Sequence, residues 1–188
     1  MTQIRTSKRL FGFLTAALLT LALAGCGSSS SGISPAAYVK SVCGTAATWY
    51  RTIQSAGGTL TSALHSSGST SQIKTSYVNF VTGLSQATRT AESRLRAAGT
   101  PSVKGGKQIA NALVGAFTSA SHGLSLAALA ANKLPTTSRS AFDSAASQVQ
   151  IQVQRALASM TSVAPQNNPQ LHAAAAKDPT CQQLKTLG

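Results

Sequence analysis

The chain has 188 residues, with 16 lysines and arginines against three acidic residues, which gives a formal net charge of +13. Hydrophobic residues make up 43% of the chain and charged residues only 10%, so a core can form and a wholly disordered chain is excluded. Three carboxylates are too few for a two-metal carboxylate site, and no pattern pairs two of them as a glycosidase requires. The length predicts one domain.

The N-terminal segment is typical of an export signal. Residues 1–9 hold three basic residues and no acid, and the apolar run over residues 10–24 carries no charge. This run is shorter than the roughly 20 residues of a spanning helix and fits the core of a signal peptide. It ends in Leu23-Ala24-Gly25-Cys26, which resembles a bacterial lipobox. The alternative is an ordinary secretory peptide with an incidental cysteine.

The lipobox resemblance divides the chain into three parts. Residues 1–25 are the expected lipoprotein signal peptide, and residues 26–34 are the expected tether, rich in Ser and Gly, that begins at Cys26. In such proteins the Cys thiol carries a diacylglycerol and the new amino group is often acylated, so two or more chains anchor the protein stably. Residues 35–188 are then one domain on the extracytoplasmic face of the cell membrane.

Two cysteines remain in the expected mature chain, Cys43 and Cys181. Disulfides persist outside the cytoplasm, and an even pair of thiols there is expected to join. The alternative is a reactive or metal-binding thiol, but no CxxC spacing or adjacent histidine favours it. A bridge would link the start of the first helix to the C-terminal tail.

Apolar residues at steps of three and four predict helices throughout residues 35–188, and no alternation typical of a strand appears. The first helix begins at Pro35 and reaches about residue 65, with Gly57-Gly58 as a point of interruption. The second follows Thr70 and stops at Gly99, the third runs from about residue 103 to Pro135, and the fourth begins near Arg139. Ser140 and Asp143 resemble its capping pair. A short fifth helix covers 171–177.

Four long helices with short breaks predict an all-α, antiparallel up-down four-helix bundle with a short C-terminal helix. The segments AAYVKSVCGTAATWY, SQATRTAESRLRAAGTPSVKGG and the late Cys181-Gln182-Gln183-Leu184 resemble small secreted proteins and lipoproteins of actinobacteria. That family is functionally uncharacterised. The resemblance implies an exported helical body with paired cysteines and transfers no catalytic residue or ligand.

The sequence favours a protein that is not an enzyme and holds neither metal nor cofactor. His65, His122 and His172 fall on three predicted segments without the local spacing of a zinc site. A serine with His122 and Asp143 would have the residue types of a triad, but no GxSxG elbow is present. The segment 99–107 departs from a phosphate-binding loop at both ends.

The positive charge favours anionic partners at the cell surface: lipid head groups, phosphate polymers or acidic proteins. The alternative is that the charge serves solubility alone. Nucleic acid is excluded by the export signal, and a monomer is expected. The first hypothesis is a non-enzymatic interaction module, and the second is a carrier or sensor of an apolar molecule in a pocket near Trp49, Phe80 and Phe117. The candidate anion-binding residues of the first are Arg94, Arg96, Lys104 and Lys107.

Overall fold

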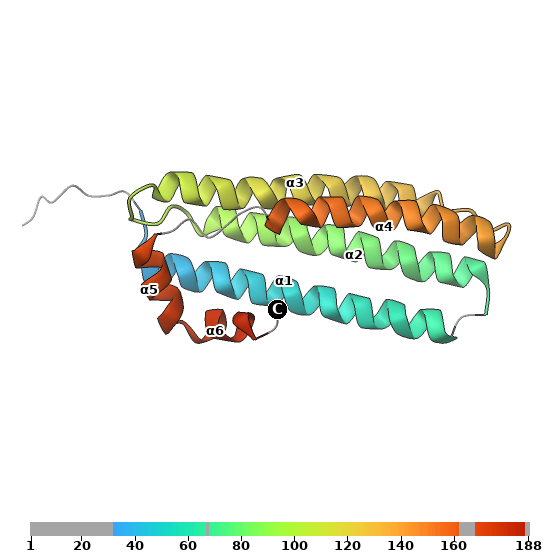
Figure 1. The fold of residues 1–188 in the computed structure, drawn as a ribbon, viewed down its shortest axis with the longest axis horizontal. Helices are drawn as coiled ribbons and strands as arrows, with labels where there is room; N and C mark the ends of the chain where they lie inside the picture. Colours follow the sequence, from blue (N-terminus) through green and yellow to red (C-terminus); the bar gives the residue numbers. More distant parts are fainter. Residues whose placement is uncertain (1–31, 67, 162–167, 187–188) are drawn as a thin grey trace, which may run out of the picture.

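Figure 1 shows the computed structural model of the protein, which describes residues 32–66, 68–161 and 168–186. These residues form six helices and no strand, which confirms the all-helical prediction. The expected signal peptide, Cys26 and the tether up to residue 31 lie outside the described residues. The helices are α1 (Pro35–Ser66), α2 (Thr70–Ala97), α3 (Gly106–Asn132), α4 (Arg139–Thr161), α5 (Pro169–Lys177) and α6 (Pro179–Lys185).

Local capping explains where the long helices begin and end. Ser69 accepts a hydrogen bond from the Gln72 amide and Gln72 bonds back to the Ser69 amide, which is a complete capping box at the start of α2. After α2, Gly99 adopts φ +76°, a conformation that favours glycine. The capping pair expected at Ser140 is wrong, because the Ser138 side chain accepts the Ala141 amide. Helix α1 continues through both central glycines.

The C-terminal tail forms a helix that the sequence analysis missed. We expected one short helix, closed by Asp178-Pro179, and the structure has two. Asp178 ends α5 and also caps α6, since its Oδ1 accepts the Cys181 amide at 3.0 Å. Pro179 then occupies the first helical position, where its missing N–H is not needed. The same dipeptide that stops one helix therefore starts the next.

Consecutive long helices run in opposite directions, and α2 lies between the others (Figure 1). Helix α2 packs against α1, α3 and α4, and α3 packs against α4. Their shared core surrounds Leu84 and Leu124, which are fully buried. Tyr77 of α2 donates to the Ala146 carbonyl of α4 at 3.2 Å and meets Phe142 edge-on. Burial raises the pKa of Tyr77, so the phenol keeps its proton.

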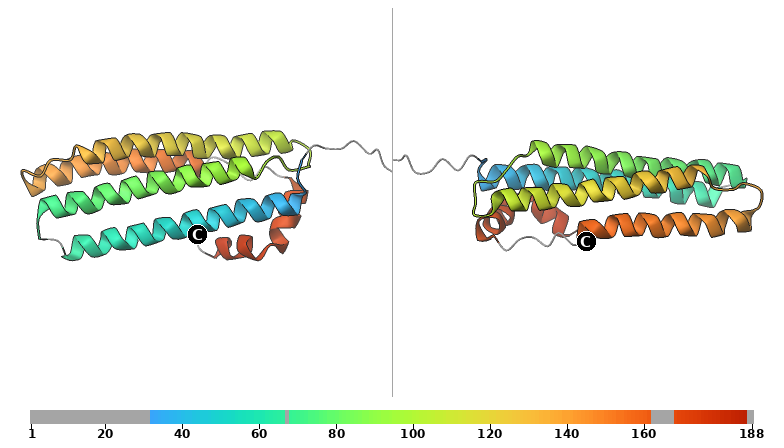
Figure 2. Two further views of the ribbon diagram at one scale, coloured as in Figure 1. Left: turned by 180° about the vertical axis from the view of Figure 1, so that it is seen from behind. Right: turned by 90° about the horizontal axis from the view of Figure 1, so that it is seen from above.

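Helix α1 is covered differently from the other long helices (Figure 2). It packs against α2 on one side and against α5 and α6 on another, but no described Cα of α1 lies within 8 Å of α4. Its predicted apolar stripe is consequently half-buried at Val42, Trp49 and Ile53. Trp49 reaches past α2 to Phe117 of α3, with ring centroids 5.9 Å apart.

Among the described residues, one helix, α3, is long and apolar enough to cross a membrane. The central helix of a soluble core has the same composition. One face of α3 is buried against α2 and α4, since Ala120, Leu124, Ala127 and Ala131 are 0% exposed, but only 28% of its most apolar stretch is buried. This single helix is weak support for a membrane span.

Candidate functional site

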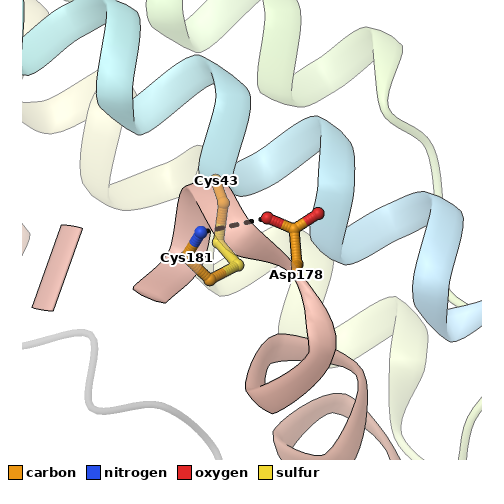
Figure 3. Close-up of side chains that lie close together, drawn as sticks. All are labelled: Cys43, Asp178 and Cys181. Carbon is orange, nitrogen blue, oxygen red and sulfur yellow. Dashed lines mark hydrogen bonds between the residues drawn. A yellow bond between two sulfur atoms is a disulfide. The ribbon is translucent and has the colours of Figure 1, made fainter. Parts of the chain in front are cut away.

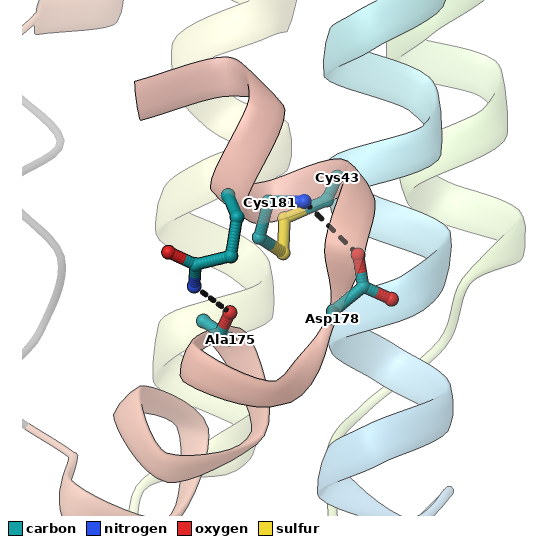
Figure 4. Close-up of a disulfide and its surroundings, with 5 residues drawn as sticks. Cys43, Ala175, Asp178 and Cys181 are labelled. Carbon is teal, nitrogen blue, oxygen red and sulfur yellow. Dashed lines mark hydrogen bonds between the residues drawn. A yellow bond between two sulfur atoms is a disulfide. The ribbon is translucent and has the colours of Figure 1, made fainter. Parts of the chain in front are cut away.

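Cys43 of α1 and Cys181 of α6 form a disulfide, with their Cα atoms 5.2 Å apart (Figure 3). The bond closes a loop with a sequence separation of 138 residues, which ties the C-terminal helices to the first helix as the even cysteine pair predicts. Gln182 reinforces the turn between α5 and α6, because its side-chain amide donates to the Ala175 carbonyl at 2.8 Å (Figure 4).

The two disulfide cysteines also belong to the one cluster, within the described ranges, of three side chains of the kinds that bind metal ions. One ligand atom each of Cys43, Asp178 and Cys181 lie within 4.8 Å of one another. Both sulfurs are joined to each other, whereas a metal would need them as thiolates. Asp178 already caps α6 through the Cys181 amide. The arrangement is a structural clamp on α1.

Glu92 lies in a polar seam between α2 and α3 that the sequence did not reveal. The hydroxyls of Thr118 and Ser121 lie 2.8 and 3.1 Å from its carboxylate oxygens, and Arg96 donates to it at 2.8 Å. The Thr118 hydrogen bond chiefly lowers the pKa of Glu92; burial opposes it, and Arg96 and Ser121 add to the lowering. The seam continues through Ser125 to the buried Ser85.

This seam fits a structural role better than a nucleophile. Ser85 and Ser121 are almost fully buried, so substrate does not reach them. The structure does not assemble the triad of a serine, His122 and Asp143 either. Asp143 forms an ion pair with Arg139 at 2.8 Å at the start of α4. Gly123, next to His122, lies against Ala156, and Asp143 lies 13 residues earlier, about 20 Å along α4 by helix rise.

The four candidate anion-binding residues lie at one end of the molecule, on either side of the α2–α3 loop. Arg94 and Arg96 occupy the last turn of α2, Lys104 lies in the loop, and Lys107 lies in the first turn of α3. All four are exposed. They do not converge on one pocket, since Arg94 lines a groove between α1 and α2 whereas Lys107 lines a hollow at the start of α3. Arg96 is held by Glu92.

The groove between α1 and α2 has a mixed lining, with apolar surface from Trp49, Ala87 and Ala91 beside polar side chains. Its walls near Trp49 carry Thr45, Thr48 and Thr52 from α1 and Gln86, Thr90 and Arg94 from α2. The pocket expected from the carrier hypothesis was to join Trp49 with Phe80 and Phe117. This groove includes neither phenylalanine: Phe117 packs against Trp49 in the interior, and Phe80 packs against the central core.

The chain enters the helical body at the same end as these cations. The amide of Ile33 donates to the Thr100 carbonyl at 2.9 Å, and the Ser102 amide donates to the Ile33 carbonyl at 2.8 Å. Gly32 lies so close that a Cβ there would come within 2.6 Å of the Thr100 oxygen. The last residues of the expected tether are therefore held against the α2–α3 loop.

The fold and the clamp define an all-helical protein whose C-terminal helices are joined to α1 by a disulfide. No protein-family model, curated protein or solved structure matches the chain. The resemblance to actinobacterial lipoproteins therefore stays a prediction.

Proposed function

We propose that the chain is a lipoprotein anchored through Cys26 on the extracytoplasmic face of the cell membrane. The described body is an up-down four-helix bundle that acts there as a non-enzymatic interaction module for an anionic partner. The anchor is supported by the basic start, the apolar run and the lipobox at residues 23–26. The disulfide supports a location outside the reducing cytoplasm.

The proposal of an anionic partner is supported by one observation: all three acidic side chains already have partners within the body. Glu92 holds Arg96, Asp143 holds Arg139, and Asp178 caps α6. Exposed cations such as Arg94, Lys104 and Lys107 have no carboxylate partner among the described residues. Positive potential that is not neutralised within the molecule attracts anions from outside.

The anchor is tested by the intact mass of protein purified from the membrane fraction. We expect a chain that begins at Cys26 and carries acyl chains, while Cys26→Ser remains unmodified. A mature N-terminus elsewhere, without lipid, would contradict the proposal. The Cys43→Ser/Cys181→Ser variant is the matched control, because it removes thiols that the anchor does not use.

Native mass spectrometry of the same sample separates the two kinds of partner. The interaction module predicts an added protein or polymer mass that salt dissociates, and charge reversal at Lys104 and Lys107 weakens it. The alternative, a carrier, predicts an added mass of a small apolar molecule that salt leaves in place. Retention of such a mass would favour the carrier and reject the anionic partner.

A further inference from the structure

The place where the chain enters the body limits how the bundle meets the bilayer. Residues 27–31 alone separate Cys26 from Gly32, which lies against the α2–α3 loop. Six extended Cα steps reach about 20 Å. Helix α3 extends about 40 Å from Lys107 to Lys133 by helix rise. If Cys26 is lipidated, the α2–α3 loop stays near the head groups, whereas Lys133 is held far from them unless the bundle lies flat.

The end that stays near the bilayer carries exposed positive charge. Lys104 and Lys107 flank the start of α3, Arg94 lies in the last turn of α2, and Lys40 lies in the second turn of α1. Two carboxylates lie on this side of the body: Glu92 is satisfied by Thr118, Ser121 and Arg96, and Asp178, next to Cys43 of α1, caps α6. The positive end of the α3 dipole adds to the same field. Within the described residues, no acid neutralises Lys104 or Lys107.

We propose that this end of the bundle, defined by Arg94, Lys104 and Lys107, docks on anionic phospholipid head groups. The inference rests on the proposed lipid anchor and names the anionic partner. A short tether gives these lysines a high effective concentration of lipid phosphates, which a polymer or protein from solution lacks. Salt screens charges beyond about 8–10 Å at physiological ionic strength, so only the cations closest to the bilayer interact strongly with it. The docked bundle stands on this end, with Lys133 away from the membrane.

A flat orientation is the competing geometry, and the structure indicates which face it would use. Leu126 and Leu129 of α3 are 51% and 62% exposed beside Lys133 and Arg155, in a shallow groove between α3 and α4. Insertion of these leucines would bring Lys133 to the head groups. Lys107 and Lys133 therefore report the two orientations from opposite ends of one helix.

The test is lysine footprinting on the full lipidated protein, inserted into preformed vesicles. One set is phosphatidylcholine, and the other contains equal parts of phosphatidylcholine and phosphatidylglycerol. A membrane-impermeant acylating reagent labels exposed amines, and mass spectrometry follows each lysine. We expect Lys104 and Lys107 to react at least about threefold more slowly on the anionic vesicles at low salt. High salt should abolish the difference, and Lys133 should react equally on both.

Charge reversal supplies the matched comparison. Lys104→Glu should remove most of the protection at Lys107, and Lys133→Glu should leave that protection intact. Both side chains are exposed, so neither change disturbs the core. Equal reactivity of all three lysines on both vesicles would overturn the docking, and so would protection of Lys133 instead of Lys107. Protection of Lys104 and Lys107 only after addition of soluble poly(glycerol phosphate) would reject the lipid in favour of a polymer.

The intact mass distinguishes the two levels of failure. A protein without lipid on Cys26 would contradict both the proposed anchor and the docking that rests on it. A lipidated protein with uniform lysine reactivity leaves the anchor standing and rejects the docking alone.

Discussion

The indole N–H of Trp49 donates a hydrogen bond to Oγ1 of Thr88 at 3.0 Å and thereby joins α1 to the fully buried interior of α2. The Thr88 hydroxyl in turn donates a hydrogen bond to the Leu84 carbonyl at 2.9 Å. Helix α1 does not contact α3 or α4 through its backbone, so the Trp49–Thr88 bond and the Trp49–Phe117 ring contact are side-chain links between α1 and the interior of the bundle.

Thr88→Val should destabilise the protein by about 1–3 kcal/mol, because the Trp49 N–H loses its acceptor in a buried place. Denaturant unfolding followed by tryptophan fluorescence measures the change. Thr52→Val is the matched control, since its hydroxyl bonds only to the Thr48 carbonyl on an exposed side of α1. Equal stability of the two variants would show that the Trp49–Thr88 bond contributes nothing.

Removal of the disulfide should lower the free energy of unfolding by up to about 5 kcal/mol, given the sequence separation of 138 residues. The change is Cys43→Ser/Cys181→Ser, and urea unfolding measures it. Reduced wild-type protein should unfold at the same urea concentration as the variant. A variant as stable as the oxidised wild type would mean that α5 and α6 stay on α1 without the bond.

Because of Glu92, the free energy of unfolding should depend on pH in the acid range. Because its folded pKa is lowered, its contribution is present above the unfolded value near 4.5 and is lost as pH falls through the folded value. At pH 7, Glu92→Gln should cost about 1–2 kcal/mol, since the carboxylate accepts charge-assisted bonds but is 17% exposed.

Urea unfolding of both proteins between pH 7 and pH 2 checks this prediction. The difference in the free energy of unfolding between wild type and Glu92→Gln should become smaller as the pH falls below 4.5. Asp143→Asn is the control: its pair with Arg139 is more than half exposed on both sides, so its effect should stay below about 1 kcal/mol. A gap that does not change with pH would contradict the assigned cause.

Gly123→Ala tests the closest approach of α3 and α4, where an added Cβ would lie 2.7 Å from the Ala156 Cβ. We expect destabilisation of about 1–3 kcal/mol from overpacking, despite the better helix propensity of alanine. Gly115→Ala, on the same helix with nothing within 4 Å of its Cβ, should stabilise by up to about 1 kcal/mol. Thermal or urea unfolding should therefore give opposite signs for these two substitutions.

Local patterns were sufficient to predict the four long helices. Pro35, Gly99 and Pro135 mark helix boundaries through their own backbone restrictions, so these predictions needed no knowledge of neighbours. The periodic positions of α2 and α4 predicted buried residues such as Leu84 and Val149. The cysteine pair followed from its even number and its expected compartment.

Long-range contacts decided what the patterns missed. Helix α6 forms where Asp178 caps it and Cys181 bonds to Cys43, and this stabilisation comes from a residue far away in the sequence. The Glu92 seam depends on Thr118 and Ser121 of another helix, whose rotation relative to α2 no local rule provides.

The candidate site divides in the same way. Composition and the residue types at positions 94, 96, 104 and 107 predicted a basic protein with an anionic partner, because charge is a sum over the sequence. Only the packing of the helices brought Ile33 against the Thr100–Ser102 loop and so placed the end of the tether beside Lys104 and Lys107. That juxtaposition joins residues about 70 positions apart, and it exists because antiparallel helices bring the start of α1 and the end of α2 to one place.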